Sequence, residues 1–319
     1  MSTARQAARI PLALAVAANL ACDAQRDDVA DTARGDTTTA AAEVEAYALV
    51  RTVTGFSTPE AARYDGEQDV WFVSNINGAP AARDNNGFIS RIRQDGTIDS
   101  LQFIAGGRGG ITLHAPKGLL VVGDTLWVAD LNIVRAFNAR TGARIADVTV
   151  RGATMLNDLA AGPDGALYVT DTGLEFGVEG AQQQPSRIYR VSGMRAELAL
   201  ESAALNGPNG IAWDGGRDAF VIGSYFGDSL FAWAPGDSEA RGIAAGPGQW
   251  DGIVILPDGR VLASSWTDSS LYVLEGSTTR KVVSGVASPG AIGIDPQRMQ
   301  VAIPSLMGNV VDLYRVPGR

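Results

Sequence analysis

Four residues with side-chain oxygens recur at the same place in a repeated sequence phrase. They are Glu60, Asn157, Asn209 and Asp251, and each one stands at the start of a short, mostly apolar segment. Two of the four are carboxylates, and such a cluster of oxygens would repel itself without a cation. Carboxylate and amide oxygens suit hard divalent cations, and Ca²⁺ takes roughly six to eight oxygen ligands. If the fold brings the four together, they predict a site for one divalent cation, with Ca²⁺ preferred over Mg²⁺ or Mn²⁺.

A local interpretation of the same residues stays open. Asn and Asp are common in the turn before a strand because their side chains bond to the nearby backbone. Each position taken singly favours this interpretation, whereas the occurrence of all four at equivalent positions favours the metal site. The remaining two copies have Lys117 and Ala291 at this position. The Lys117 ammonium would either bind an anionic group of a substrate or form a structural ion pair with Glu60 or Asp251.

Several other kinds of site are excluded by composition. His114 is the only histidine and Cys22 the only cysteine, so no zinc site built on several His or Cys and no intramolecular disulfide can form. We interpret His114 as a loop residue. The sequence has no Gly-x-Ser-x-Gly turn and no phosphate-binding loop. Its net charge of -9 argues against nucleic acid as a partner.

The repeated phrase predicts the fold. In each copy a turn leads into a first short strand, and a second apolar strand begins about ten residues after the first. The second strands are expected at residues 70–75, 126–130, 167–171, 219–223, 261–265 and 301–305. A period of roughly 40–50 residues with several strands per unit is typical of propeller blades. We therefore predict an all-β fold, a six-bladed β-propeller over residues 44–319.

The ends of this domain predict how the ring closes. A strand expected at residues 310–316 ends the last blade one strand short, and a strand expected at residues 48–53 has no hairpin partner. We predict that this N-terminal strand completes blade six, which would remove the exposed sheet edges. In a propeller, the turns before the innermost strands surround one mouth of the central channel. The four oxygen-bearing residues would then converge there.

The first 43 residues have a different composition. Arg5 and Arg9 precede an apolar stretch at residues 10–21, which is too short to span a bilayer as a helix. This stretch ends in Asn-Leu-Ala-Cys, which resembles a bacterial lipobox. We predict a lipoprotein-type signal peptide over residues 1–21, lipidation at Cys22, and a periplasmic or membrane-anchored protein whose only membrane contact is the lipid. An ordinary signal peptide is the alternative. Residues 22–43 lack large apolar side chains almost entirely and predict a flexible tether.

Four turns resemble those of the SMP-30/gluconolactonase/regucalcin-like family, and the resemblance extends over about residues 55–316. They are Thr58-Pro59-Glu60, Leu156-Asn157-Asp158, Asn206-Gly207-Pro208-Asn209-Gly210 and Trp250-Asp251-Gly252. The resemblance implies a six-bladed propeller with one divalent metal, often Ca²⁺, on its axis. It implies that Glu60, Asn157, Asn209 and Asp251 hold this metal. It also implies that Asp251 is the acid and base in the opening of lactones or esters.

The chain departs from the sugar lactonases of that family at the position of their substrate-binding arginine, where it has Met155. Met155, Trp250, Trp266, Tyr225 and Phe226 predict a more apolar mouth. We take Lys117, Met155, Trp250 and Trp266 as the substrate-binding candidates. The predicted function is metal-dependent hydrolysis of a small lactone or other ester by a monomer. The alternative is a non-catalytic, surface-tethered propeller that uses its metal for structure or ligand binding.

Overall fold

The structure is a computed structural model that describes residues 46–177 and 180–318. The predicted signal peptide, the lipidation at Cys22 and the tether lie outside the described residues. No helix within residues 46–177 and 180–318 is long and apolar enough to cross a membrane.

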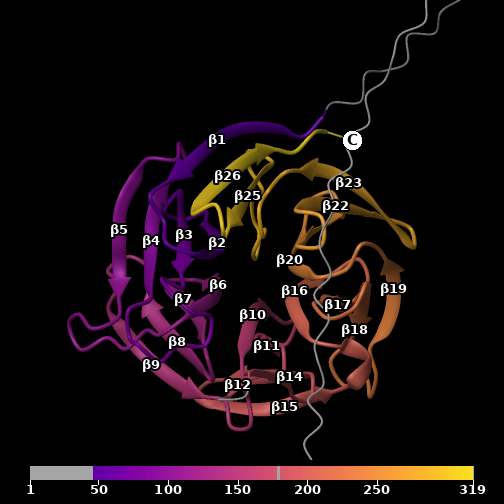
Figure 1. Cartoon of the computed structure of the whole chain (residues 1–319), viewed down its shortest axis with the longest axis horizontal. Helices are drawn as coiled ribbons and strands as arrows, with labels where there is room; N and C mark the ends of the chain where they lie inside the picture. The colour runs from indigo at the N-terminus through magenta and orange to yellow at the C-terminus, as the bar shows by residue number, and fades with distance from the viewer. Residues whose placement is uncertain (1–45, 178–179, 319) are drawn as a thin grey trace, which may run out of the picture. The chain divides into compact units, whose positions relative to one another are not determined.

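Six four-stranded antiparallel sheets form a ring, which confirms the predicted six-bladed β-propeller (Figure 1). Blade one contains β2 (Pro59–Asp65), β3 (Val70–Asn75), β4 (Phe88–Arg93) and β5 (Ile98–Ala105). Blade two contains β6 (Pro116–Val122), β7 (Thr125–Asp130), β8 (Ile133–Asn138) and β9 (Arg144–Thr149). Blade three contains β10 (Leu156–Ala161), β11 (Leu167–Asp171), β14 (Arg187–Ser192) and β15 (Arg195–Glu201).

The other three blades repeat this order from the centre outward. Blade four contains β16 (Pro208–Asp214), β17 (Ala219–Ser224), β18 (Ser229–Trp233) and β19 (Arg241–Ala245). Blade five contains β20 (Trp250–Ile255), β21 (Val261–Ser265), β22 (Ser270–Glu275) and β23 (Thr278–Ser284). Blade six contains β24 (Gly293–Asp295), β25 (Gln300–Ser305), β26 (Val310–Arg315) and the N-terminal β1 (Ala48–Thr54).

Blade six closes the ring as predicted. Strand β1 pairs antiparallel with β26, with Ala48 opposite Arg315 and Thr54 opposite Val310. A second closure lies nearer the axis, where the Ala291 N–H donates to the Glu60 carbonyl at 2.8 Å and the Ala62 N–H donates to the Ala291 carbonyl at 3.0 Å. Blades one and six are therefore joined at both the outer and the inner edge.

One element was not predicted. A separate two-stranded hairpin, β12 (Leu174–Gly177) and β13 (Gly180–Gln183), is inserted between the second and third strands of blade three. The sequence pattern did not reveal it because its strands are short and occur in only one blade.

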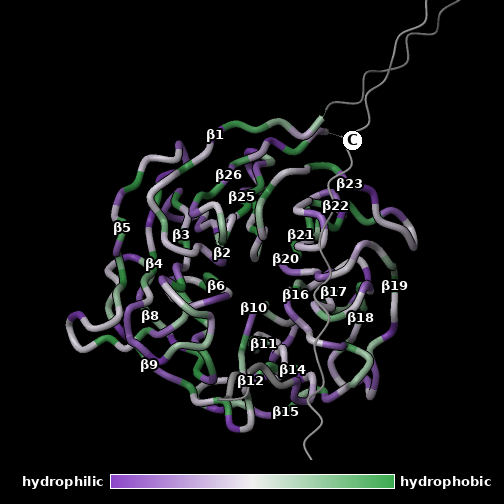
Figure 2. Tube along the Cα trace, viewed as in Figure 1, coloured by the Kyte–Doolittle hydropathy of each residue, from purple (hydrophilic) through white to green (hydrophobic). Residues whose placement is uncertain are grey.

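The hydrophobic core lies between neighbouring blades. Figure 2 shows short hydrophobic stretches interrupted by hydrophilic ones all around the ring. Between blades three and four, the rings of Tyr168 and Phe220 have centroids 4.7 Å apart, and the ring of Trp233 stacks on Phe220 at 6.0 Å. Between blades one and two, Phe72 belongs to a buried cluster with Leu119. Each blade thus buries hydrophobic side chains against its neighbours, as expected for a repeat architecture.

Glycines next to the axis allow the inner strands to approach one another closely. A Cβ atom on Gly210 would lie 2.0 Å from the carbonyl oxygen of Asp251, and one on Gly252 would lie 2.2 Å from the backbone nitrogen of Ile292. Both contacts are with backbone atoms, so no side-chain rotation can relieve them.

We expect Gly210→Ala to lower the free energy of unfolding by about 1–3 kcal/mol, because it overpacks the contact between β16 and β20. Gly242→Ala is the matched control in β19, where an added Cβ meets nothing within 4 Å. The control should be neutral or slightly stabilising. Urea unfolding of both variants is the measurement, and equal stability of the two would contradict this account of the axis.

Candidate functional site

Five inner strands begin with the same irregularity. The pairing register with the second strand shifts between Pro59 and Ala62 in β2, and equivalent shifts occur at the start of β6, β10, β16 and β20. Such a bulge redirects a side chain. The second residue of each of these strands lies within the bulge: Glu60, Lys117, Asn157, Asn209 and Asp251. These strands surround the centre of the ring (Figure 1).

The five residues line one cavity of about 320 Å³. These residues are only 3–4% exposed. Met155 and Trp266 line the same cavity. The structure therefore brings together seven of the eight residues that the sequence analysis selected as metal, catalytic or substrate-binding candidates.

Trp250 is the residue that the structure does not bring to this cavity. Its side chain is fully buried with Val221 and Leu230 of blade four, and its indole N–H donates to the Asp228 carbonyl at 2.8 Å. Successive side chains of a strand point to opposite sides. Because Asp251 lines the cavity, the neighbouring Trp250 points into the core.

Four buried oxygens in the cavity have no hydrogen-bond partner: Glu60 Oε2, Asn157 Oδ1, Asn209 Oδ1 and Asp251 Oδ1. The amide nitrogens of both asparagines are occupied. Asn157 Nδ2 donates to Thr172 Oγ1 at 3.1 Å, and Asn209 Nδ2 donates to Asp251 Oδ2 at 3.2 Å. These bonds fix the orientation of both amides and leave their oxygens unpaired.

An unpaired buried polar group costs about 1–3 kcal/mol, and native proteins rarely keep one without a reason. Four unpaired oxygens in one cavity, two of them from carboxylates, form a donor set that fits a hard divalent cation. Among residues 46–177 and 180–318, no three His, Cys, Asp or Glu side chains form a metal-binding group. The candidate set is therefore a mixed one, with two carboxylates and two amides.

Hydroxyl groups on the second strands hold the bulges in place. Thr170 Oγ1 accepts the Asp158 N–H at 3.0 Å and donates to the Asn209 carbonyl at 2.5 Å. Ser264 Oγ accepts the Gly252 N–H and donates to the Gly290 carbonyl at 2.9 Å. Each hydroxyl links the backbone beside one candidate ligand to the next blade. This role of Thr170 and Ser264 was not predicted from the sequence.

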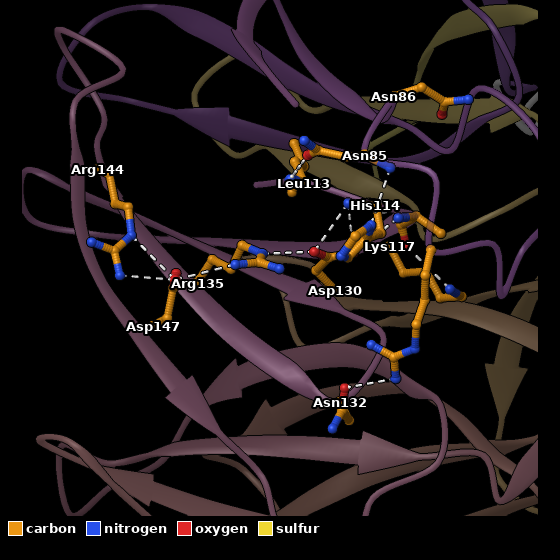
Figure 3. A network of polar contacts seen from close by, with 12 residues as sticks. Asn85, Asn86, Leu113, His114, Lys117, Asp130, Asn132, Arg135, Arg144 and Asp147 are labelled. Atoms are coloured by element: carbon orange, nitrogen blue, oxygen red, sulfur yellow. Dashed lines mark hydrogen bonds and ion pairs between the residues drawn. The ribbon is translucent and has the colours of Figure 1, made fainter. Parts of the chain in front are cut away.

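Acidic residues at the ends of second strands hold the loops that lead into the inner strands. The Asp130 carboxylate accepts the backbone N–H groups of His114 and Ala115 and forms an ion pair with Arg135, whose Nε lies 2.6 Å away (Figure 3). His114 Nδ1 accepts the Asn85 N–H at 3.1 Å. His114 is not among the residues that line the cavity, in agreement with its interpretation as a loop residue.

The Lys117 ammonium is bound by backbone rather than by carboxylates. Its Nζ donates to the carbonyls of Pro80 at 2.7 Å and Ala115 at 3.2 Å. In the described part of the chain no carboxylate lies within ion-pair distance of it, so the ion pair with Glu60 or Asp251 is not formed. Burial lowers the pKa of Lys117, and the negative charge of Glu60 opposes that effect. One of its three N–H donors is left for the cavity.

Arg63 was missed by the sequence analysis. Its guanidinium lies among four blades: Nε donates to the Leu119 carbonyl at 2.6 Å, Nη1 to the Ile292 carbonyl at 3.3 Å, and Nη2 to Asp158 Oδ1 at 3.1 Å. Asp158 is fully buried directly beside Asn157, and burial raises its pKa while Arg63 opposes that rise. Arg63 and Asp158 stand 95 positions apart, so no local pattern announces the pair.

Burial makes the two carboxylic acids among the candidate ligands, Asp251 and Glu60, weaker acids in the metal-free protein. Burial, together with the charge of Asp158, raises the pKa of Asp251 to about 8, and the Trp266 indole and the Asn209 amide oppose this rise. The Trp266 N–H faces Asp251 without reaching full hydrogen-bond geometry. Burial, followed by the charge of Asp251, also raises the pKa of Glu60 well above its ordinary value.

We expect the metal-free protein to lose stability as pH rises from about 4 to 8. In that window the folded protein keeps a proton on Asp251 that the unfolded chain has already released. Unfolding therefore releases a proton, and rising pH makes unfolding more favourable. Asp251→Asn should show a shallower decline, with the remainder due to Glu60 and other groups. Urea unfolding with chelator at several pH values tests this, and parallel curves for the two proteins would refute it.

A second hollow, of about 420 Å³, lies on blade one and is lined by Gln68, Asp69, Val70, Arg91, Arg93, Gln94, Asp95 and Asp99. Arg91 and Arg93 form ion pairs with Asp99, and Asp69 forms one with Arg298 outside the hollow. It therefore lacks the unpaired buried oxygens that distinguish the axial cavity.

Comparisons with known proteins agree with this architecture. A family model described as the SMP-30/Gluconolactonase/LRE-like region matches residues 58–293. A comparison with curated protein sequences found no match. Similar solved structures include a gluconolactonase from Xanthomonas campestris, which is 17% identical with a TM-score of 0.63, and the match covers 86% of this chain and 96% of that chain.

Two further structures have the same fold and other names. A luciferin-regenerating enzyme is 12% identical with a TM-score of 0.63, and the match covers 85% of this chain and 95% of that chain. The virginiamycin B lyase from Staphylococcus aureus is 13% identical with a TM-score of 0.58, and the match covers 85% of this chain and 99% of that chain. At these identities the likeness establishes the fold, and the reaction has to be argued from the site.

Proposed function

Because this chain belongs to the SMP-30/gluconolactonase/LRE-like family, we propose that it is a divalent-metal-dependent hydrolase acting on a lactone or other ester. The observation that carries the proposal is the set of four unpaired, buried oxygens in the axial cavity. Glu60, Asn157, Asn209 and Asp251 would hold the metal, with Ca²⁺ preferred. When bound, such a cation polarises a carbonyl group and lowers the pKa of a bound water.

The residues of the chain would divide the remaining tasks. Asp251 Oδ2 accepts the Asn209 amide, which orients the carboxylate and leaves Oδ1 free. In its ionised form, Asp251 would take a proton from the attacking water and return it to the oxygen of the broken ester bond. The remaining N–H of Lys117 would donate to negative charge that develops on the substrate. Apolar walls, including the partly buried Trp266, would limit the access of bulk water to the site.

The first experiment measures metal binding. Calorimetric titration of Ca²⁺, Mg²⁺ and Mn²⁺ into chelator-treated protein should reveal one site per chain. Asn209→Ala should weaken binding by roughly 10-fold or more, because it removes an oxygen ligand and the amide that orients Asp251. Asn86→Ala is the control, since Asn86 is exposed and does not line the cavity. No binding of any of the three cations by the wild type would sink the metal site.

The second half of the proposal requires turnover. A panel of lactones and aryl esters should be assayed with the metal-loaded protein and again with chelator. Hydrolysis that disappears with chelator and returns with the cation is the expected result. Full metal occupancy without hydrolysis of any lactone or ester would favour the alternative, a propeller that uses its metal for structure or ligand binding.

A further inference from the structure

We infer that the axial cavity selects a lactone or ester with an apolar alkyl substituent and discriminates against polyhydroxylated lactones. This inference names the substrate class and rests on the proposed function for the reacting group. It is drawn from the division of the cavity into two parts. The polar floor is formed by the five residues in the bulges, and the apolar wall is formed by the remaining large side chains that line the cavity.

Five polar side chains of the cavity lie in the bulges, and most of the hydrogen-bonding groups on this side are already committed. Four of them are the candidate metal ligands, and two of the three Lys117 donors are occupied by backbone carbonyls. Thr172 Oγ1 accepts the Asn157 amide and donates to the Pro208 carbonyl at 3.0 Å. Little hydrogen-bonding capacity is therefore left for the hydroxyl groups of a substrate.

The remaining lining is predominantly apolar. Its large apolar or aromatic side chains are Ile76, Pro80, Met155, Leu174, Tyr225, Trp266, Leu306 and Met307. Thr58 Oγ1, the Tyr225 hydroxyl and the Trp266 indole N–H are the polar side-chain atoms available on this wall within the described residues. Burying a hydroxyl without a partner is unfavourable by about 1–3 kcal/mol. A ring with several hydroxyls would incur this cost repeatedly.

Aromatic rings continue the wall from the cavity toward solvent. The rings of Trp266 and Tyr225 are in edge-to-face contact, with centroids 5.7 Å apart. The rings of Tyr225 and Phe226 are in edge-to-face contact, with centroids 5.4 Å apart. Phe226 is 39% exposed and Met307 is 71% exposed. These exposed apolar side chains would extend the surface that contacts the alkyl chain of a substrate whose reacting group lies at the polar floor.

The cavity volume suits such a ligand. About 320 Å³ corresponds to on the order of ten water volumes, enough for a five-membered ring with several methylene groups. Each buried methylene contributes about 0.8 kcal/mol, which corresponds to about a fourfold gain in affinity. The gain should continue until the chain leaves the cavity and should then level off.

The experiment measures binding without turnover. The probes are γ-lactams with alkyl substituents of increasing length, because the amide ring resists hydrolysis, together with a polyhydroxylated lactam. Calorimetry is carried out with the full protein at saturating Ca²⁺ and repeated with chelator. We expect affinity to rise by up to about fourfold per methylene and the polyhydroxylated lactam to bind more weakly than any alkyl lactam. A flat series, or tighter binding of the polyhydroxylated probe, would overturn the inference.

Two methionines provide a matched pair of variants. Met307 lines the cavity and is 71% exposed. Met194 is in the turn that connects the outer strands β14 and β15, and it is 62% exposed. Met307→Asn should reduce the gain per methylene for the longer chains, and Met194→Asn should leave the series unchanged. Because both side chains are exposed, both variants should keep the wild-type melting temperature. Identical binding series for the two variants would contradict the assigned wall.

The outcome also separates the two proposals. If alkyl lactams bind with chain-length dependence while the matching lactones are not hydrolysed, the inference stands and the proposed hydrolysis fails. If polyhydroxylated lactones are hydrolysed and the alkyl series is flat, the proposed hydrolysis stands and the inference fails.

Discussion

Replacing Asp251 with Asn is expected to lower ester or lactone hydrolysis by about 10²–10⁴-fold, the usual contribution of general acid–base assistance. The substitution keeps an oxygen near the position of Oδ1 but removes the negative charge and the site that takes the proton. Metal affinity should fall much less than in Asp251→Ala, which removes the ligand altogether. The measurement is kcat at saturating metal, with metal occupancy determined separately for each variant.

The control for charge is Asp237→Asn, because Asp237 is exposed on blade four and does not line the cavity. It should retain wild-type hydrolysis. Substantial activity of Asp251→Asn at full metal occupancy would leave the hydrolase proposal in place but remove Asp251 as its base. Loss of metal together with loss of activity would instead identify Asp251 as a ligand whose charge the site requires.

Arg63→Ala is expected to have the largest effect on stability. It removes the cation from a buried ion pair and leaves the fully buried Asp158 uncompensated, which typically costs about 3–5 kcal/mol. It also leaves the carbonyls of Leu119 and Ile292 without their donors. The melting temperature should fall by on the order of 10 °C for a domain of this size.

Two comparisons make this result specific. Arg140→Ala removes two ion pairs, with Asp124 and Glu67, whose side chains are 50–64% exposed, so it should lower stability far less than Arg63→Ala does. The double variant Arg63→Ala with Asp158→Asn should be more stable than Arg63→Ala alone, because no buried charge then remains unpaired. If Arg63→Ala lowered the free energy of unfolding no more than Arg140→Ala does, the contacts of the Arg63 guanidinium with the other blades would not be important for stability.

Much of the fold could be predicted because each blade of a propeller repeats the same pattern of turns and short apolar strands. The spacing of the short apolar strands indicated the number of blades, and the unpaired strand at residues 48–53 indicated the closure that β1 and β26 make. The hairpin formed by β12 and β13 escaped because it belongs to one blade only. A pattern that occurs once cannot be recognised by repetition.

The candidate site was predictable to the same extent. Glu60, Asn157, Asn209 and Asp251 occupy the same bulge position in blades one, three, four and five, so their convergence follows once the ring is recognised. The two tryptophans show where this reasoning stops. Trp266 lines the cavity, whereas Trp250 lies in the core. The period-2 alternation of a strand already places Trp250 on the side opposite Asp251, and that signal was available but was not applied.

By itself, the sequence determined what depends on neighbours along the chain: the repeated strands, the turns that lead into them and the residue types that meet at the axis. The tertiary structure alone decided what depends on partners far apart in sequence. Arg63 selects Asp158 from a blade two positions around the ring, Lys117 donates to two backbone carbonyls instead of a carboxylate, and four oxygens are left unpaired in one cavity. The physical reason is that desolvation and pairing of charges are set by the environment that the closed ring creates, and no segment carries that environment alone.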